Sequence, residues 1–175
     1  MLENRRAVRT KVMQALFAYK SIEGEPKVAY NLLLKETEAE VIELEASKGI
    51  EGDLQLLKTL FFETIRNGEQ YDELLKEKTS NWDLDRIARL DKVLLQMAIC
   101  EVLNFENIPV KVTINEYLEL AKEYSTPESN KFINGVLDAL IVDFTAKGLI
   151  RKDERGSQTE KKTPILTIQK KNKPF

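Results

Sequence analysis

The chain has 175 residues, 42% of them hydrophobic, and a formal net charge of −2 at pH 7. This length and composition predict one folded domain and exclude a chain that is disordered throughout. The chain has no histidine, which excludes histidine-based catalytic triads, general bases and metal sites. Carboxylates can still catalyse a reaction or bind Mg²⁺, so composition leaves other enzymes open.

Composition also favours a helical, soluble protein. The chain has 7 glycines and 5 prolines, few for an all-β protein, and it is rich in leucine, glutamate, lysine and alanine. Its one cysteine, Cys100, cannot form an internal disulfide, which fits a reducing compartment. No apolar run is long enough to span a membrane, and the N-terminus lacks a signal-peptide pattern. We therefore expect an all-α protein of the cytoplasm, with no membrane partner.

Charge is distributed unevenly along the chain. Residues 1–20 contain five basic residues against Glu3 alone, and residues 151–175 contain eight basic and three acidic residues. The middle of the chain is therefore acidic and both ends are basic, which can indicate a basic arm for an anionic partner.

The first predicted helix begins near Asn4, a residue type that favours N-cap positions. Its apolar stripe is formed by Val8, Val12, Leu16 and Tyr19. Arg5, Arg9 and Lys11 are expected to project beside this stripe or away from it.

Two further helices are predicted before residue 80. The second is expected to turn four apolar residues inward: Leu32, Leu33, Val41 and Leu44. Asp53 is expected to cap the third, which runs to about Lys78. Asn67-Gly68 interrupts the third helix with a turn signal and predicts a kink or a tight packing point. Trp82, in the break that follows, is expected to anchor the core.

The next helix is expected to be central, because it carries apolar residues on most of its faces. These residues are Ile87, Leu90, Val93, Leu94, Met97, Ala98 and Val102. After a loop at residues 107–109, Thr113 and Glu116 have the spacing of a capping box and predict the start of a fifth helix.

The last predicted helix opens with Pro127 in its first turn and ends near Gly148. Gly135 lies inside its apolar stripe, where glycine costs about 1 kcal/mol relative to alanine. Close approach of another helix would explain such a glycine, so we expect tight packing there. Residues 1–148 are expected to form the folded domain and residues 149–175 a mobile basic tail. Within that tail, residues 164–168 have the pattern of a short strand or docking segment.

Four segments of the chain together resemble the NusB family over roughly residues 4–146. They are Arg5-Arg6-Ala7-Val8-Arg9, residues 89–102 beginning Arg89-Leu90-Asp91-Lys92, residues 108–122 beginning Ile108-Pro109-Val110-Lys111, and Lys131-Phe132-Ile133-Asn134-Gly135-Val136-Leu137-Asp138. The last two segments, in this order and spacing, are highly specific to the family.

The resemblance implies an all-α domain of two perpendicular three-helix bundles. It further implies a non-enzymatic antitermination factor that pairs with the ribosomal protein NusE and binds single-stranded boxA RNA. This heterodimer acts on RNA polymerase so that it reads through terminators, notably in ribosomal RNA operons. The resemblance implies no cofactor and leaves a homodimer open.

The resemblance also implies site residues. Those expected to bind RNA are Arg5, Arg6, Arg9, Lys11, Glu128, Lys131 and Phe132. Those expected to lie at the NusE surface are Phe17, Asp91, Glu101 and Val110. Independently of the family, arginine offers phosphate a planar donor fork, and an aromatic ring at a helix start offers bases a stacking platform. An acidic surface around Asp91 would suit a basic ribosomal protein.

Three other interpretations compete with this one. An enzyme would need carboxylates that converge in a cleft, and the sequence offers no spaced set. A generic helical scaffold would explain the amphipathic helices but not the basic N-terminus. The same fold also forms the N-terminal part of a ribosomal RNA cytosine methyltransferase, so a related module without an antitermination role is the alternative. The chain is too short for the methyltransferase domain and has no glycine-rich cofactor loop.

Overall fold

The computed structural model describes residues 4–22, 24–79 and 84–150. Within these residues the protein has helices but no strand, which confirms the all-α prediction. The helices are α1 (Arg5–Tyr19), α2 (Pro26–Leu33), α3 (Lys35–Lys48), α4 (Asp53–Arg66), α5 (Gly68–Lys78), the short 3-10 helix η1 (Leu84–Arg86), α6 (Arg89–Asn104), α7 (Val110–Tyr124) and α8 (Pro127–Ala146). None of the described helices is both long and apolar enough to span a bilayer.

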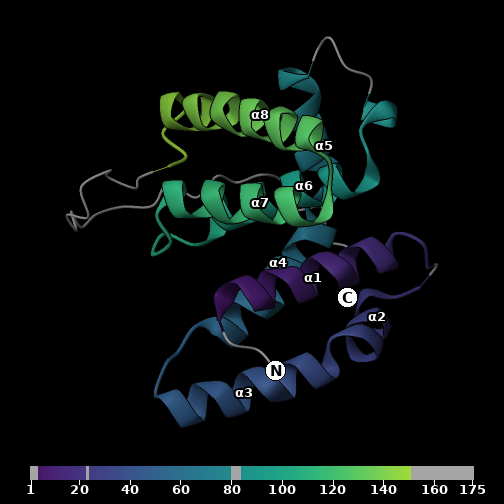
Figure 1. The fold of residues 1–175 in the computed structure, drawn as a ribbon, viewed down its shortest axis with the longest axis vertical. Coiled ribbons are helices and arrows are strands. Elements are labelled where there is room, and N and C mark those ends of the chain that lie inside the picture. The colour runs from purple at the N-terminus through teal and green to yellow at the C-terminus, as the bar shows by residue number, and fades with distance from the viewer. Residues whose placement is uncertain (1–3, 23, 80–83, 151–175) are drawn as a thin grey trace.

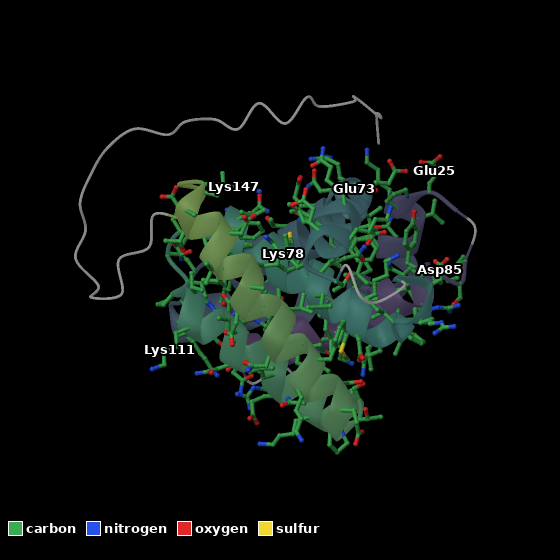
Figure 2. All side chains as sticks on the ribbon, turned by 90° about the horizontal axis from the view of Figure 1, so that it is seen from above. Glu25, Glu73, Lys78, Asp85, Lys111 and Lys147 are labelled. Atoms are coloured by element: carbon green, nitrogen blue, oxygen red, sulfur yellow. The ribbon has the colours of Figure 1, made fainter. Side chains whose placement is uncertain are left out.

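The helices form two halves, as the family resemblance implies (Figure 1). Helices α1 to α4 pack together in one half, and α5 to α8 pack together in the other. Both α1 and α4 also pack against α6, so the two halves share one continuous core. Helix α5 is tied to α8 by two ion pairs, because Lys78 lies 3.3 Å from Asp143, and Lys147, directly after α8, lies 4.0 Å from Glu77. Figure 2 shows Lys78 and Lys147 beside α8.

Helix α6 is the central helix that the sequence predicts. Every residue from Val93 to Val102 is buried. An isolated helix cannot bury all its faces, so this run requires neighbours on several sides, and α1, α4, α5, α7 and α8 supply them. Gln96 and Glu101 are polar residues within the buried run, and each is expected to need a hydrogen-bonding partner.

The predicted second and third helices are each divided in two. The second breaks at the buried residue Leu34, whose φ of −127° and ψ of 0° lie outside helical geometry. Leu32 was expected to face the core, but it is 72% exposed on the outer face of α2. The third breaks at Asn67, between α4 and α5, which confirms the kink predicted at Asn67-Gly68.

Two helix starts follow their sequence signals. Asn4 caps α1, because its side-chain oxygen accepts a hydrogen bond from the backbone N–H of Ala7 at 3.1 Å. Thr126 caps α8 in the same way by accepting from the N–H of Ser129 at 3.1 Å. Pro127 then occupies the first turn of α8, where its missing N–H is not needed.

The prediction that Asp53 caps the third helix is wrong. Asp53 is the first residue of α4, and Gly52 precedes it with a left-handed φ of 101°. The backbone N–H groups of Asp53 and Leu54 have no acceptor within α4, and they donate instead to the carboxylate of Glu45, at 2.7 and 3.0 Å. A side chain from α3 therefore caps α4, and this long-range partner has no local sequence signal.

The predicted capping box at Thr113 and Glu116 is also wrong. Helix α7 begins three residues earlier, at Val110, with Pro109 in the N-cap position. The fixed φ of proline suits that position. Thr113 and Glu116 therefore lie inside α7, and both side chains contact other helices. Trp82 and residues 164–168 lie outside the described residues.

Gly135 does not mark a close helix contact. A Cβ atom built at this position would have no heavy atom within 4 Å, and the residue is exposed on α8. The expectation of tight packing is therefore wrong, and the glycine only weakens the helix.

We expect the Gly135→Ala substitution to stabilise the protein by up to about 1 kcal/mol, because alanine favours helix and restricts the unfolded chain. Urea denaturation followed by circular dichroism would measure the change. Gly135→Leu serves as the companion variant, since the open space predicts that it also folds without loss. A destabilised leucine variant would show that Gly135 is in contact after all.

Candidate nucleic-acid and partner interface

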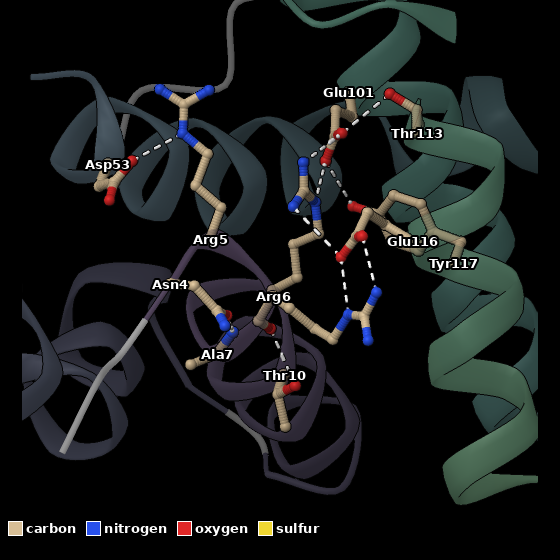
Figure 3. A network of polar contacts seen from close by, with 11 residues as sticks. Asn4, Arg5, Arg6, Ala7, Thr10, Asp53, Glu101, Thr113, Glu116 and Tyr117 are labelled. Carbon is tan, nitrogen blue, oxygen red and sulfur yellow. Dashed lines mark hydrogen bonds and ion pairs between the residues drawn. The ribbon is translucent and has the colours of Figure 1, made fainter. Parts of the chain in front are cut away.

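The N-terminal turn of α1 and the start of α7 flank an open cavity of about 490 Å³ that is lined by both polar and apolar groups. The residues that line it are Asn4, Arg5, Arg6, Arg9, Asn107, Ile108, Pro109, Val112 and Glu116. The cavity brings together the three arginines that the sequence singled out. Each of these arginines, however, has an acidic partner within the protein (Figure 3).

Arg6 makes a paired contact with Glu116 of α7. Its Nε and Nη2 atoms donate to the two carboxylate oxygens, both at 2.9 Å (Figure 3). This hydrogen bond raises the pKa of Arg6 and lowers the pKa of Glu116. The Arg6 side chain is 45% exposed, so its donor fork can be reached from solvent.

Arg9 is buried and belongs to the core. Its Nε and Nη2 atoms donate to the carboxylate of Glu101, both at 2.8 Å. The hydroxyls of Thr113 and Tyr117 donate to the same carboxylate at 2.9 and 3.0 Å. Burial alone would lower the pKa of Arg9, but the hydrogen bond and charge of Glu101 outweigh it and raise that pKa. Burial raises the pKa of Tyr117 well above its ordinary value.

This network corrects two sequence predictions. Arg9, which was expected to bind RNA, is not accessible to it, because its side chain is only 3% exposed. Glu101 is fully buried and is not part of a surface. Sequence reasoning missed the network as a whole, although a glutamate inside the apolar run of α6 was a signal that a buried partner must exist.

Arg5 links α1 to the start of α4. Its Nε atom donates to Asp53 at 2.7 Å, and its side chain is 39% exposed while that of Asp53 is 4% exposed. Lys11 lies further along α1 and is exposed. Arg5, Arg6 and Lys11 are therefore the accessible members of the predicted basic arm.

The other residues predicted to contact RNA lie at the start of α8. Glu128 and Lys131 are exposed, and Phe132 is partly buried against the core. None of the three lines the cavity at the start of α1. The structure thus places the predicted RNA residues in two groups, on different helices.

Asp91 positions the second of these groups. Its two carboxylate oxygens accept hydrogen bonds from the hydroxyls of Ser125 and Ser129, at 2.7 and 2.6 Å. The residue is only 4% exposed, so the prediction that it lies on an acidic encounter surface is wrong. It instead joins the start of α6 to the start of α8, and so fixes where Glu128 to Phe132 lie.

The remaining residues of the predicted partner surface are accessible. Phe17 is 41% exposed, and the guanidinium of Arg89 lies 5.7 Å from the centre of its ring. Phe17 also lines an apolar cavity of about 240 Å³ with Met13, Gln14, Leu90 and Tyr124. Val110, the first residue of α7, is partly exposed.

Cys100 has the environment of a packing residue. It is fully buried in α6, and burial raises the pKa of its thiol to about 12. The part of the chain that the structure describes contains no group of three or more residues able to hold a metal ion.

The Arg6–Glu116 pair predicts a pH dependence of stability. Because the folded state lowers the pKa of Glu116 below 4.5, the pair stabilises the protein above that pH. This stabilisation is lost as pH falls through the folded pKa. We expect Glu116→Gln to be less stable at neutral pH and to lose less stability between about pH 5 and pH 3.

Urea denaturation at several pH values would measure this difference. Glu119→Gln is the matched control on the same helix, because Glu119 is 47% exposed and forms an ion pair with its neighbour Lys122, whereas the paired hydrogen bonds of Arg6 are made to Glu116. Parallel stability curves for the parent and Glu116→Gln would contradict the assignment.

Three comparisons relate this chain to known proteins. The model of the NusB family matches residues 6–141. The transcription antitermination protein NusB of Salinibacter ruber is 36% identical over 155 residues, which cover 89% of this chain and 91% of that protein. The crystal structure of Thermotoga maritima NusB is 27% identical with a TM-score of 0.64, and the match covers 85% of this chain and 98% of that one.

A structure of NusB and NusE in complex with double-stranded RNA also shares the fold. Its matching chain is 19% identical, with a TM-score of 0.63, and the match covers 82% of this chain and 99% of that one. The family match extends over most of the described helices, and the relative from S. ruber is matched along nearly its whole length. The chain belongs to the NusB family.

Proposed function

We propose that this protein is a transcription antitermination factor that pairs with NusE and binds single-stranded boxA RNA. In this role it is a non-enzymatic adaptor of the cytoplasm that acts on RNA polymerase within an antitermination complex. The matched relative from S. ruber carries the name transcription antitermination protein, and nearly its whole length is covered. This coverage supports the same role here.

The main observation in support of RNA binding is that the guanidinium of Arg6, with its paired hydrogen-bond donors, is accessible to solvent. Its Nε and Nη2 atoms already hold two oxygens of Glu116 at 2.9 Å. A phosphate group presents two oxygens in a similar geometry, and arginine binds both groups through the same paired hydrogen bonds. An RNA phosphate can therefore replace Glu116 at Arg6, with Arg5 beside it in the same cavity.

The apolar cavity at Phe17 supports a protein partner. Interfaces are enriched in aromatic and arginine residues that fill pockets, and this site combines Phe17, Tyr124 and Arg89. The structure that shares this fold contains NusE together with NusB and RNA. We therefore assign the Phe17 surface to NusE and the Arg6 surface to RNA.

Fluorescence anisotropy with a labelled boxA RNA and a scrambled RNA, at one fixed salt concentration, would test this function. We expect tighter binding of boxA, and a further gain when NusE is added. Phe17→Asp should remove the gain from NusE while it leaves the binding of RNA by the protein alone unchanged. Val142→Asp is the matched control, because Val142 is 71% exposed on α8. Equal affinity for both RNAs, with and without NusE, would refute the proposal.

A further inference from the structure

Helices α2 and α3 present apolar side chains to solvent. Val28 and Leu32 are 64% and 72% exposed, one helical turn apart on α2, and Ile42 of α3 is 50% exposed. Ala39 and Ala46 are exposed at helical spacing from Ile42. Helices α2 and α3 pack against each other, and we call the exposed apolar residues Val28, Leu32, Ala39, Ile42 and Ala46 of this pair the α2–α3 face. Large exposed apolar patches mark surfaces that another segment or protein covers.

One edge of the α2–α3 face is acidic. Glu36 and Glu43 are exposed and lie seven residues apart along α3, so they line a single edge of the helix, two turns apart. Two other glutamates of α3 are oriented differently. Glu38 pairs with Lys35 and Lys58, and Glu45 caps α4. The segment that covers this face should therefore be apolar and flanked by basic residues.

The sequence of this chain contains such a segment near its C-terminus. Residues 161–173 read Lys-Lys-Thr-Pro-Ile-Leu-Thr-Ile-Gln-Lys-Lys-Asn-Lys. Three aliphatic residues stand at its centre, two lysines precede them, and three lysines follow. The acidic residues of the tail all lie before Lys161. Apolar and charged groups in this segment thus match those of the α2–α3 face in kind.

The chain is long enough for this contact. Helix α8 is followed by described residues up to Ile150, and the 15 residues from there to Ile165 can span about 50 Å when extended. A compact domain of this size has a radius of gyration of about 15 Å and a diameter near 40 Å. A chain that follows the surface needs about 60 Å to reach the opposite side of such a domain, and the 18 residues from Ile150 to Ile168 span about 60 Å when extended, so the segment is long enough to reach the α2–α3 face.

We propose that residues 161–173 dock in cis on the α2–α3 face. The aliphatic side chains cover Val28, Leu32 and Ile42, and the lysines pair with the glutamates along the edge. Docking removes the apolar surface from water, and it keeps these lysines away from non-specific contacts with RNA phosphates. This contact is separate from the RNA and NusE surfaces, so it can fail while the proposed function holds.

Disulfide trapping in the full-length protein would test the contact. The Ile42→Cys/Ile168→Cys variant should form an intramolecular disulfide under mild oxidation, and Cys100 does not interfere because it is fully buried. The matched control is Val142→Cys/Ile168→Cys, since Val142 is 71% exposed on α8. Position 142 is much nearer than position 42 to position 168 along the chain. If the tail is not docked, this shorter connection should make the control disulfide form more readily than the Ile42 disulfide.

We expect the Ile42 pair to give the higher yield of monomeric disulfide, and this yield to fall when Ile165→Asp is added. High salt should lower it as well, because salt screens the lysine–glutamate pairs. Hydrogen exchange in α2 and α3 should likewise be faster in the Ile165→Asp variant of the parent protein. An equal or higher yield for the control pair would overturn the proposal. So would disulfides that link only two copies, which would assign the α2–α3 face to a dimer.

Discussion

Glu101→Ala is expected to destabilise the protein by about 3–5 kcal/mol, because loss of the carboxylate leaves the buried charge of Arg9 without its partner. Glu101 is fully buried and accepts hydrogen bonds from Arg9, Thr113 and Tyr117. Without the carboxylate, the remaining acidic partner of Arg9 among the described residues is Glu116, at 3.7 Å from the guanidinium. Total stabilities are typically about 5–15 kcal/mol, so this variant should lie close to unfolding at moderate temperature.

Urea denaturation would measure the loss, with Glu119→Ala on α7 as the exposed control. The double variant Arg9→Met/Glu101→Leu should recover much of the stability, since well-packed apolar residues often replace a buried ion pair at little cost. A loss below about 1 kcal/mol for Glu101→Ala would contradict the assignment, because such a small change is typical of an exposed pair.

The hydrogen-bond network around Glu101 also explains how the buried Arg9 side chain can influence RNA binding. Arg9 joins α1 to α6, and Thr113 and Tyr117 join the same carboxylate to α7. Arg6 lies one turn before Arg9, and its partner Glu116 lies beside Tyr117 on α7. The buried ion pair therefore fixes the distance across which Arg6 and Glu116 face each other.

Much of the fold could be predicted from local patterns. The apolar periodicity of α6 predicted its burial, and the caps at Asn4 and Thr126–Pro127 predicted where α1 and α8 begin. Breaks were harder to predict, because Leu34 has no turn signal and interrupts the helix through its packing in the core. The start of α4 also depends on Glu45, which is eight residues from Asp53 in the sequence.

The sequence indicated candidate charged residues for the site, but it did not predict whether each side chain is buried or exposed. Arg6 and Arg9 are both arginines near the N-terminus, and only the tertiary structure shows that one is 45% exposed and the other 3%. The family resemblance placed the acidic residues Asp91 and Glu101 at or near the partner surface. Each is instead buried with hydrogen-bond donors from a distant helix, and sequence spacing cannot reveal such partners.

The Arg6→Gln/Lys11→Gln variant is expected to bind boxA RNA more weakly while it remains folded. Arg6 is half-exposed and Lys11 is exposed, so the cost in stability should be limited to the loss of the Arg6–Glu116 pair. Arg5 is kept in this variant, because its loss would leave the buried carboxylate of Asp53 without its partner. Each lost phosphate contact on a single strand should reduce the slope of log affinity against log salt by about 0.7, so two contacts reduce it by about 1.4.

Anisotropy titrations at four or more salt concentrations would give this slope. Lys27→Gln/Lys76→Gln is the matched control, because it removes the same charge from exposed positions on α2 and α5. If both double variants reduce affinity and slope equally, the effect comes from net charge and not from a defined arm. If neither changes the slope, the start of α1 does not contact phosphate. A loss confined to Arg6→Gln/Lys11→Gln would place the RNA backbone at the cavity where Glu116 now holds the guanidinium of Arg6.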